Sequence, residues 1–181
     1  MRDPARTSAA AERRYRGYIQ QAISCVSAAV LYTGPAPNDA PDEYLALLSR
    51  ESPIRLTTSE GYELRLEFMQ LGEFVPDDRF PGETRVATRA YYYALTDDSS
   101  VVLIEWHWDT NRHPEPHIHV PALDHPAARR RLHVPTGGRR VSIEQVVSWL
   151  IEEWGVRPAR ADYSEVLADT QARFDEHRRQ D

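Results

Sequence analysis

Six of the seven histidines lie between His107 and His133, and the densest part of this segment reads EWHWDTNRHPEPHIHVPA over residues 105–122. Imidazole can exchange a proton near neutral pH without special tuning, and it is the commonest metal ligand in proteins. The segment therefore predicts a chemical site that uses either acid/base catalysis or a bound metal ion. The sequence alone leaves both uses open.

Side-chain alternation predicts that several of these histidines share one face of a sheet. Apolar residues alternate with histidines or charged residues in each of three expected strands, over residues 101–108, 117–120 and 131–134. Successive side chains of a strand point to opposite faces. If the apolar residues face the core, the other face carries His107, His117, His119 and His133.

A hairpin through residues 110–116 would bring two of these strands together. In the simplest register, Asp109 lies opposite His117 and His107 lies opposite His119, with about 5 Å between the Cβ atoms of each pair. A shift of two residues would keep the shared face but change the partners.

Metal-independent cleavage of RNA is the first chemistry that such a face could perform. One histidine would take the proton of the 2′-hydroxyl, another would protonate the leaving oxygen, and an arginine would stabilise the phosphorane. Residues 107–140 hold six arginines and three acidic residues in a chain whose formal net charge is −6, and a basic segment of this kind favours RNA as a partner. The predicted catalytic residues are His107, His117, His119 and Asp109. The predicted substrate-binding residues are Arg112, His113, Arg131, Tyr91 and Tyr93, the last two by stacking on bases.

A metal site is the alternative use of the same residues. His117 and His119 lie two apart on one strand face, and His107 with either Asp109 or His113 would complete the ligand set. Three histidines and an open position suit catalytic zinc, whereas histidine with a carboxylate suits non-haem iron. A metal-dependent hydrolase or oxygenase would follow. A non-catalytic interaction module is the third alternative, and in the leading interpretation no cofactor is needed.

Length and composition are typical of a globular protein with its own core. The chain has 181 residues, 41% of them hydrophobic, and its single cysteine, Cys25, excludes an internal disulfide. No apolar segment is long enough to span a membrane. We expect a cytoplasmic protein that does not contact membranes. The sequence leaves open whether the protein forms a homodimer.

The order of expected elements predicts an α+β fold. Residues 1–41 form an N-terminal helical segment, with its helix over 12–32, and a proline-rich linker, while 42–181 form one α+β domain with the histidine-rich hairpin at 101–121. A short helix is expected over 42–48, and two helices follow Ser142 and Asp162. Between them, strands over 62–68, 85–95 and the three segments above give an antiparallel sheet of about four to five strands, with one N-terminal and two C-terminal helices.

The stretch YYYALTDDSSVVLIEWHWDTNRHPEPHIHVP, residues 91–121, resembles the TumE-type toxins of bacterial toxin–antitoxin modules. The resemblance rests on Tyr91 and Tyr93, on the pairs Trp108-Asp109 and His113-Pro114, on Pro116-His117-Ile118-His119, and on the helix after Ser142. It covers about a third of the chain. It implies a small α+β toxin that acts on RNA as an endoribonuclease and is neutralised by a small DNA-binding antitoxin protein.

Overall fold

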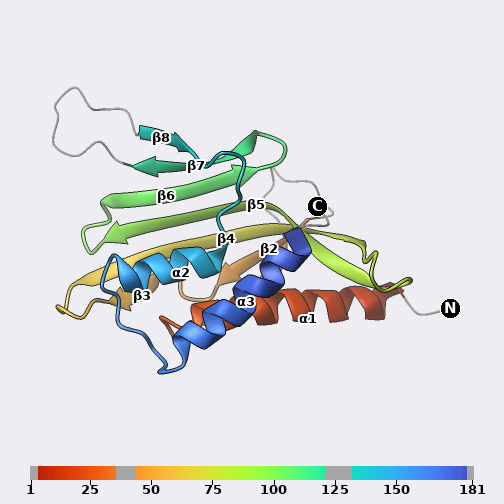
Figure 1. The fold of residues 1–181 in the computed structure, drawn as a ribbon, viewed down its shortest axis with the longest axis horizontal. Coiled ribbons are helices and arrows are strands. Elements are labelled where there is room, and N and C mark those ends of the chain that lie inside the picture. The colour runs from red at the N-terminus through yellow and green to blue at the C-terminus, as the bar shows by residue number, and fades with distance from the viewer. Residues whose placement is uncertain (1–3, 36–43, 121–131, 179–181) are drawn as a thin grey trace.

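The computed structural model describes residues 4–35, 44–120 and 132–178, and these form three helices and eight strands (Figure 1). The helices are α1 (Pro4–Ile23), α2 (Ile143–Glu152) and α3 (Tyr163–Arg178). The strands are β1 (Leu31–Pro35), β2 (Tyr44–Ser49), β3 (Ile54–Thr57), β4 (Glu63–Pro76), β5 (Thr84–Asp97), β6 (Val102–Asp109), β7 (His113–Val120) and β8 (Leu132–Pro135).

All eight strands belong to one antiparallel sheet in the order β1-β2-β4-β5-β6-β7-β8. The eighth, β3, pairs with the first part of β4, whereas β2 pairs with the second part. The α+β class, the antiparallel pairing and the one N-terminal and two C-terminal helices are confirmed. The prediction of four to five strands is wrong, because β1, β2 and β3 had no strand assigned to them.

Two helix predictions were wrong near the N-terminus. Residues 42–48 were expected to be helical, but Tyr44–Ser49 is strand β2, which pairs with β1 on one side and β4 on the other. The first helix ends at Ile23 rather than near residue 32. The Gln20 side chain explains this end, since it donates to the Ala29 carbonyl at 2.8 Å and accepts from the Leu31 N–H at 2.7 Å. These bonds hold the departing chain against the helix and start β1.

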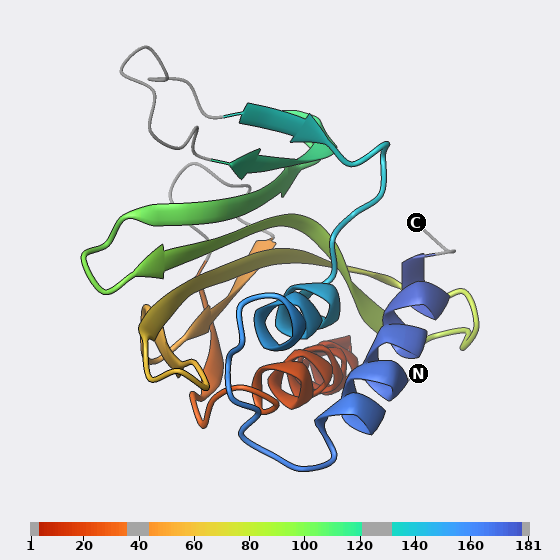
Figure 2. The same cartoon turned by 60° about the vertical axis from the view of Figure 1, so that its left-hand side comes forward.

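The three helices cover one face of the sheet, as Figure 2 shows. The main hydrophobic core lies between these two layers and includes Ile23 from α1, Val146 and Leu150 from α2, and Leu66 and Trp106 from the sheet. Trp106 is 1% exposed and stacks on Trp149 of α2, with 6.1 Å between the ring centroids. The core therefore fixes which face of β6 turns inward.

Helix α2 begins where the sequence predicted. Ser142 accepts a hydrogen bond from the backbone N–H of Gln145, and the Gln145 side chain accepts one from the Ser142 N–H, which completes a capping box. None of the helices within the described ranges is long and apolar enough to cross a membrane.

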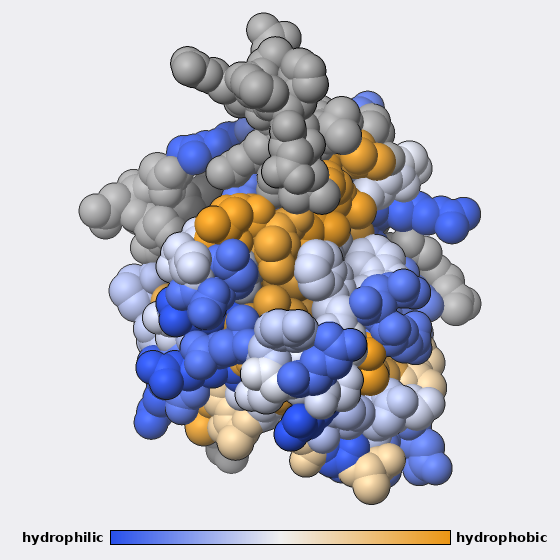
Figure 3. Space-filling view, turned by 90° about the vertical axis from the view of Figure 1, so that its left-hand side faces the viewer, coloured by the Kyte–Doolittle hydropathy of each residue, from blue (hydrophilic) through white to orange (hydrophobic). Residues whose placement is uncertain are grey.

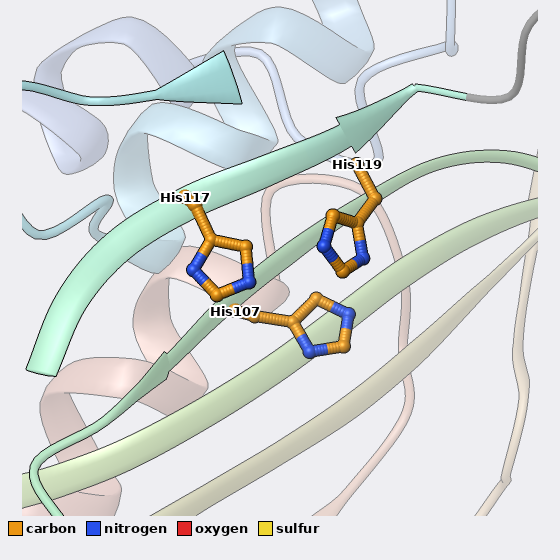
Figure 4. A group of neighbouring side chains, drawn as sticks. All are labelled: His107, His117 and His119. Carbon is orange, nitrogen blue, oxygen red and sulfur yellow. The ribbon is translucent and has the colours of Figure 1, made fainter. Parts of the chain in front are cut away.

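At one edge, β7 and β8 extend beyond the helices (Figure 2). Figure 3 shows apolar side chains gathered in a strip at one end of the molecule. Among the described residues, Val101 in the β5–β6 turn and Val134 in β8 are exposed large hydrophobic side chains. The histidines of β6 and β7 lie on the sheet face that the helices do not cover (Figure 4).

Candidate metal centre

Strand β6 separates its side chains between the core and the outer face of the sheet. Trp106 and Trp108 are buried in the core on the helix side. Because side chains alternate, Glu105 and His107 lie on the outer face. Figure 4 shows the rings of His107, His117 and His119 together in front of the strands, with the helices behind. The predicted shared face is confirmed for these three histidines.

The register differs from the predicted one by two residues. His107 pairs with His117 and Glu105 pairs with His119, whereas Asp109 pairs with His113. The expected loop was too long, because β7 already begins at His113. The two-residue shift preserves the shared face.

The three rings form a compact group. Their centroids are 5.6 Å apart for His107 and His117, and 4.8 Å apart both for His107 and His119 and for His117 and His119. One nitrogen from each ring can be chosen so that all three lie within 4.8 Å of one another. His117 is buried, while the His107 and His119 side chains are 26% and 25% exposed. A small ligand can therefore approach the group from the solvent side.

Glu105 places one carboxylate against two of the three rings. Its Oε2 lies 3.7 Å from His107 Nε2 and 3.5 Å from His119 Nδ1, and both nitrogens are buried. The Tyr92 hydroxyl donates to the other oxygen, Oε1, at 3.3 Å. The side chain of Glu105 is only 3% exposed. A buried carboxylate in this position favours a positively charged partner.

His117 is oriented by the backbone instead. Its Nδ1 lies 2.9 Å from the carbonyl oxygen of Glu115. A carbonyl only accepts, so Nδ1 carries the proton and donates it. Each of the three rings thus directs one nitrogen toward an oxygen atom, as metal-binding histidines commonly do.

The other predicted catalytic residue has a different place. Asp109 accepts hydrogen bonds from the backbone N–H groups of Asn111 at 2.8 Å and Arg112 at 3.3 Å. Its carboxylate therefore closes the hairpin turn, and it is not one of the three residues whose ligand atoms lie within 4.8 Å. The prediction of Asp109 as a ligand is not supported by this geometry, and Glu105 is the carboxylate beside the rings.

The predicted substrate-binding residues are only partly near the group. His113 is exposed, with its ring edge toward His117 at a centroid distance of 5.6 Å. Arg112 is exposed in the same turn. Arg131 lies outside the described residues. Arg140, counted in the basic segment, lies on the helix side, 4.5 Å from the Trp108 ring centroid.

Tyr91 and Tyr93 do not face the histidines, so the prediction that they stack on bases is wrong. Both are buried in the core, and their rings stack on each other with 4.9 Å between centroids. Their middle neighbour, Tyr92, pairs with His107 and meets its ring edge-on at 4.8 Å. Tyr91 and Tyr93 lie on the inner face of the sheet, where their rings pack in the hydrophobic core.

Sequence reasoning missed the roles of Glu105 and Tyr92. The signal for Glu105 was present, since its position places it on the same strand face as His107. Tyr92 could have been found by aligning the tyrosine strand with β6, but that register depends on pairing that the sequence does not display.

No protein-family model matches the chain, and no curated protein or solved structure is significantly similar to it. The resemblance to TumE-type toxins stays a prediction.

Proposed function

We propose that His107, His117 and His119 bind one divalent metal ion, with zinc the best match, and that the protein is a metal-dependent hydrolase. The observation that carries the proposal is the orientation of the rings. One nitrogen of each faces Glu105 or the Glu115 carbonyl. In that arrangement the second nitrogens, His107 Nδ1, His117 Nε2 and His119 Nε2, bind the metal.

The distances between the histidine nitrogens allow the three rings to move together around one ion. Nitrogens bound to one tetrahedral zinc at about 2.0–2.1 Å lie about 3.3 Å apart. In the structure, one nitrogen from each of the three rings lies within 4.8 Å of the other two nitrogens. Small side-chain rotations supply the remaining approach.

Three histidine ligands leave the fourth position of zinc for water. A zinc ion held there would supply a Lewis acid that activates water for attack near neutral pH. The partial exposure of His107 and His119 allows a substrate to reach this position. Glu105 orients two ligands and balances part of the positive charge. A cytoplasmic location is part of this proposal.

The first experiment measures metal content. Protein purified without a polyhistidine tag is stripped with a chelator, reloaded with zinc or iron(II), and analysed by mass spectrometry and calorimetry. We expect one ion per chain, lost in His107→Ala, His117→Ala and His119→Ala. His113→Ala is the matched control, because it lies in the same hairpin but outside the group. Failure to bind either ion, or equal binding by all four variants, contradicts the proposal.

The metal-independent ribonuclease is the competing proposal for the same residues. It is favoured by the closeness of three imidazoles and by exposed Arg112 in the same hairpin. The two proposals differ in the effect of a chelator. RNA cleavage that persists in chelator and disappears in His117→Ala favours the ribonuclease and, with toxicity on expression, a TumE-like toxin with an antitoxin partner. Hydrolysis that requires the ion favours the metal centre. A stable protein with neither property is an interaction module.

A further inference from the structure

A cavity of about 530 Å³ lies on the helix side of the sheet, away from the histidines. It is bounded by α1, β4, β5, α2, α3 and the β4–β5 turn. This volume lies within the range of sites that hold small organic ligands, about 300–1,000 Å³. The lining is partly apolar, with Ile19, Val86, Ile143 and Phe174 among its side chains.

Seven polar side chains that line this cavity are more than nine-tenths buried. They are Gln70, Asp77, Arg85, Tyr91, Tyr93, Glu144 and Thr170, with exposed fractions of 5%, 5%, 8%, 4%, 1%, 5% and 1%. Polar side chains in a core cost free energy unless they find partners. Their concentration around one cavity indicates a built polar surface rather than a packing defect.

The hydrogen bonds among these polar side chains leave the hydroxyl protons of Tyr91 and Tyr93 able to donate to a ligand. The Tyr15 hydroxyl donates to Gln70 Oε1 at 2.8 Å, and Gln70 Nε2 donates to the Tyr93 hydroxyl. The Tyr91 hydroxyl accepts from the Val141 N–H at 2.9 Å. A phenol that accepts one bond still has its own proton to donate. Tyr91 and Tyr93, stacked side by side, can therefore both donate to an oxygen atom inside the cavity.

The charges around the cavity favour an uncharged occupant. Five arginines line the cavity, and each has a partner. Arg14 lies 3.5 Å from Glu83, Arg79 pairs with both Asp77 and Glu176, and Arg173 lies 2.8 Å from Asp169. Arg140 lies over the Trp108 ring, and Arg85 interacts electrostatically with Asp77. Burial raises the pKa of Glu144, which favours its neutral acid at the inner end. A charged ligand would have to break existing ion pairs or enter without a counterion.

We propose that this cavity binds an uncharged small molecule with an apolar body and an oxygen acceptor that receives hydrogen bonds from Tyr91 and Tyr93. The site is separate from the proposed metal centre, since the two lie on opposite faces of β5. The three consecutive tyrosines at residues 91–93 of β5 alternate between the two sites. Tyr91 and Tyr93 line the cavity, while Tyr92 contacts His107 and Glu105.

The test uses three probes with the same ring: 2-naphthamide, naphthalene and 2-naphthoate. Binding to the full chain is measured by NMR titration. We expect 2-naphthamide to bind more tightly than either other probe. Tyr93→Phe and Tyr91→Phe should each weaken it about fivefold, the effect of one hydrogen bond. Tyr92→Phe is the matched control and should leave binding unchanged.

A second variant tests the cavity itself. Ala11→Leu on α1 adds apolar volume to the lining and should reduce binding of both 2-naphthamide and naphthalene, with melting temperature as the check on folding. The proposal is overturned if 2-naphthamide does not bind at millimolar concentration, if 2-naphthoate binds more tightly, or if Tyr92→Phe and Tyr93→Phe weaken binding equally. Metal content is measured in parallel and does not decide this result.

Discussion

Glu105 offers the sharpest test of the proposed metal centre, because one carboxylate contacts two of the three rings. Both contacts use Oε2, at 3.7 Å from His107 Nε2 and 3.5 Å from His119 Nδ1, while Tyr92 donates to Oε1. In Glu105→Gln, the amide oxygen can take the Oε2 position and its NH₂ group can donate to the Tyr92 hydroxyl. This substitution therefore removes the negative charge while keeping the contacts.

In Glu105→Ala, the charge and both contacts are lost. Removing a residue that orients metal ligands costs about 10–100-fold in affinity. We expect Glu105→Gln to weaken zinc binding about tenfold, or about 1.4 kcal/mol, and Glu105→Ala about a hundredfold, or about 2.7 kcal/mol.

The assay is competition for zinc with a chromophoric chelator, at fixed pH and ionic strength. Glu67→Gln is the matched control. Glu67 pairs with Ala94, which pairs with Glu105, so the two carboxylates lie on the same sheet face two strands apart. Unchanged zinc affinity in Glu105→Ala, with folding intact, would refute the orienting role. A loss as large in Glu67→Gln would indicate a general charge effect instead.

Three further predictions concern the scaffold. Ser142→Ala breaks the capping box of α2 and should lower the free energy of unfolding by about 1 kcal/mol in urea titrations, whereas an unchanged value would mean that packing alone fixes the helix start. Trp106→Ala should cost about 3–5 kcal/mol, because a side chain that is 1% exposed leaves a cavity under α2, and a loss below 1 kcal/mol would contradict its central place. Burial raises the pKa of Glu144, so its stabilising contribution is present at acidic pH and is lost as pH rises through the folded-state pKa; Glu144→Gln should flatten this part of the stability–pH profile, and an unaltered profile would contradict the assignment.

The sequence identified the elements whose patterns are local. Ser142 and Gln145 marked the start of α2, and the alternation of tryptophan and histidine in β6 predicted the face on which the histidines lie. Both signals arise within a few residues of backbone, so they need no knowledge of distant partners.

Other parts of the fold depended on pairing between distant segments. Residues 44–49 contain leucine and alanine, which suit a helix, yet they form β2 because β1 and β4 provide hydrogen-bonding partners on both sides. The choice between Asp109 and Glu105 beside the rings followed from the hairpin register in the same way.

The chain by itself determined that His107, His117 and His119 share a sheet face, because side-chain direction follows from the backbone geometry of each strand. Only the tertiary structure decided that Glu105 and Tyr92 stand beside them and that Tyr91 and Tyr93 belong to the core. The physical reason is that register and burial are set by turn length, neighbouring strands and the helix layer, which act together only in the folded molecule.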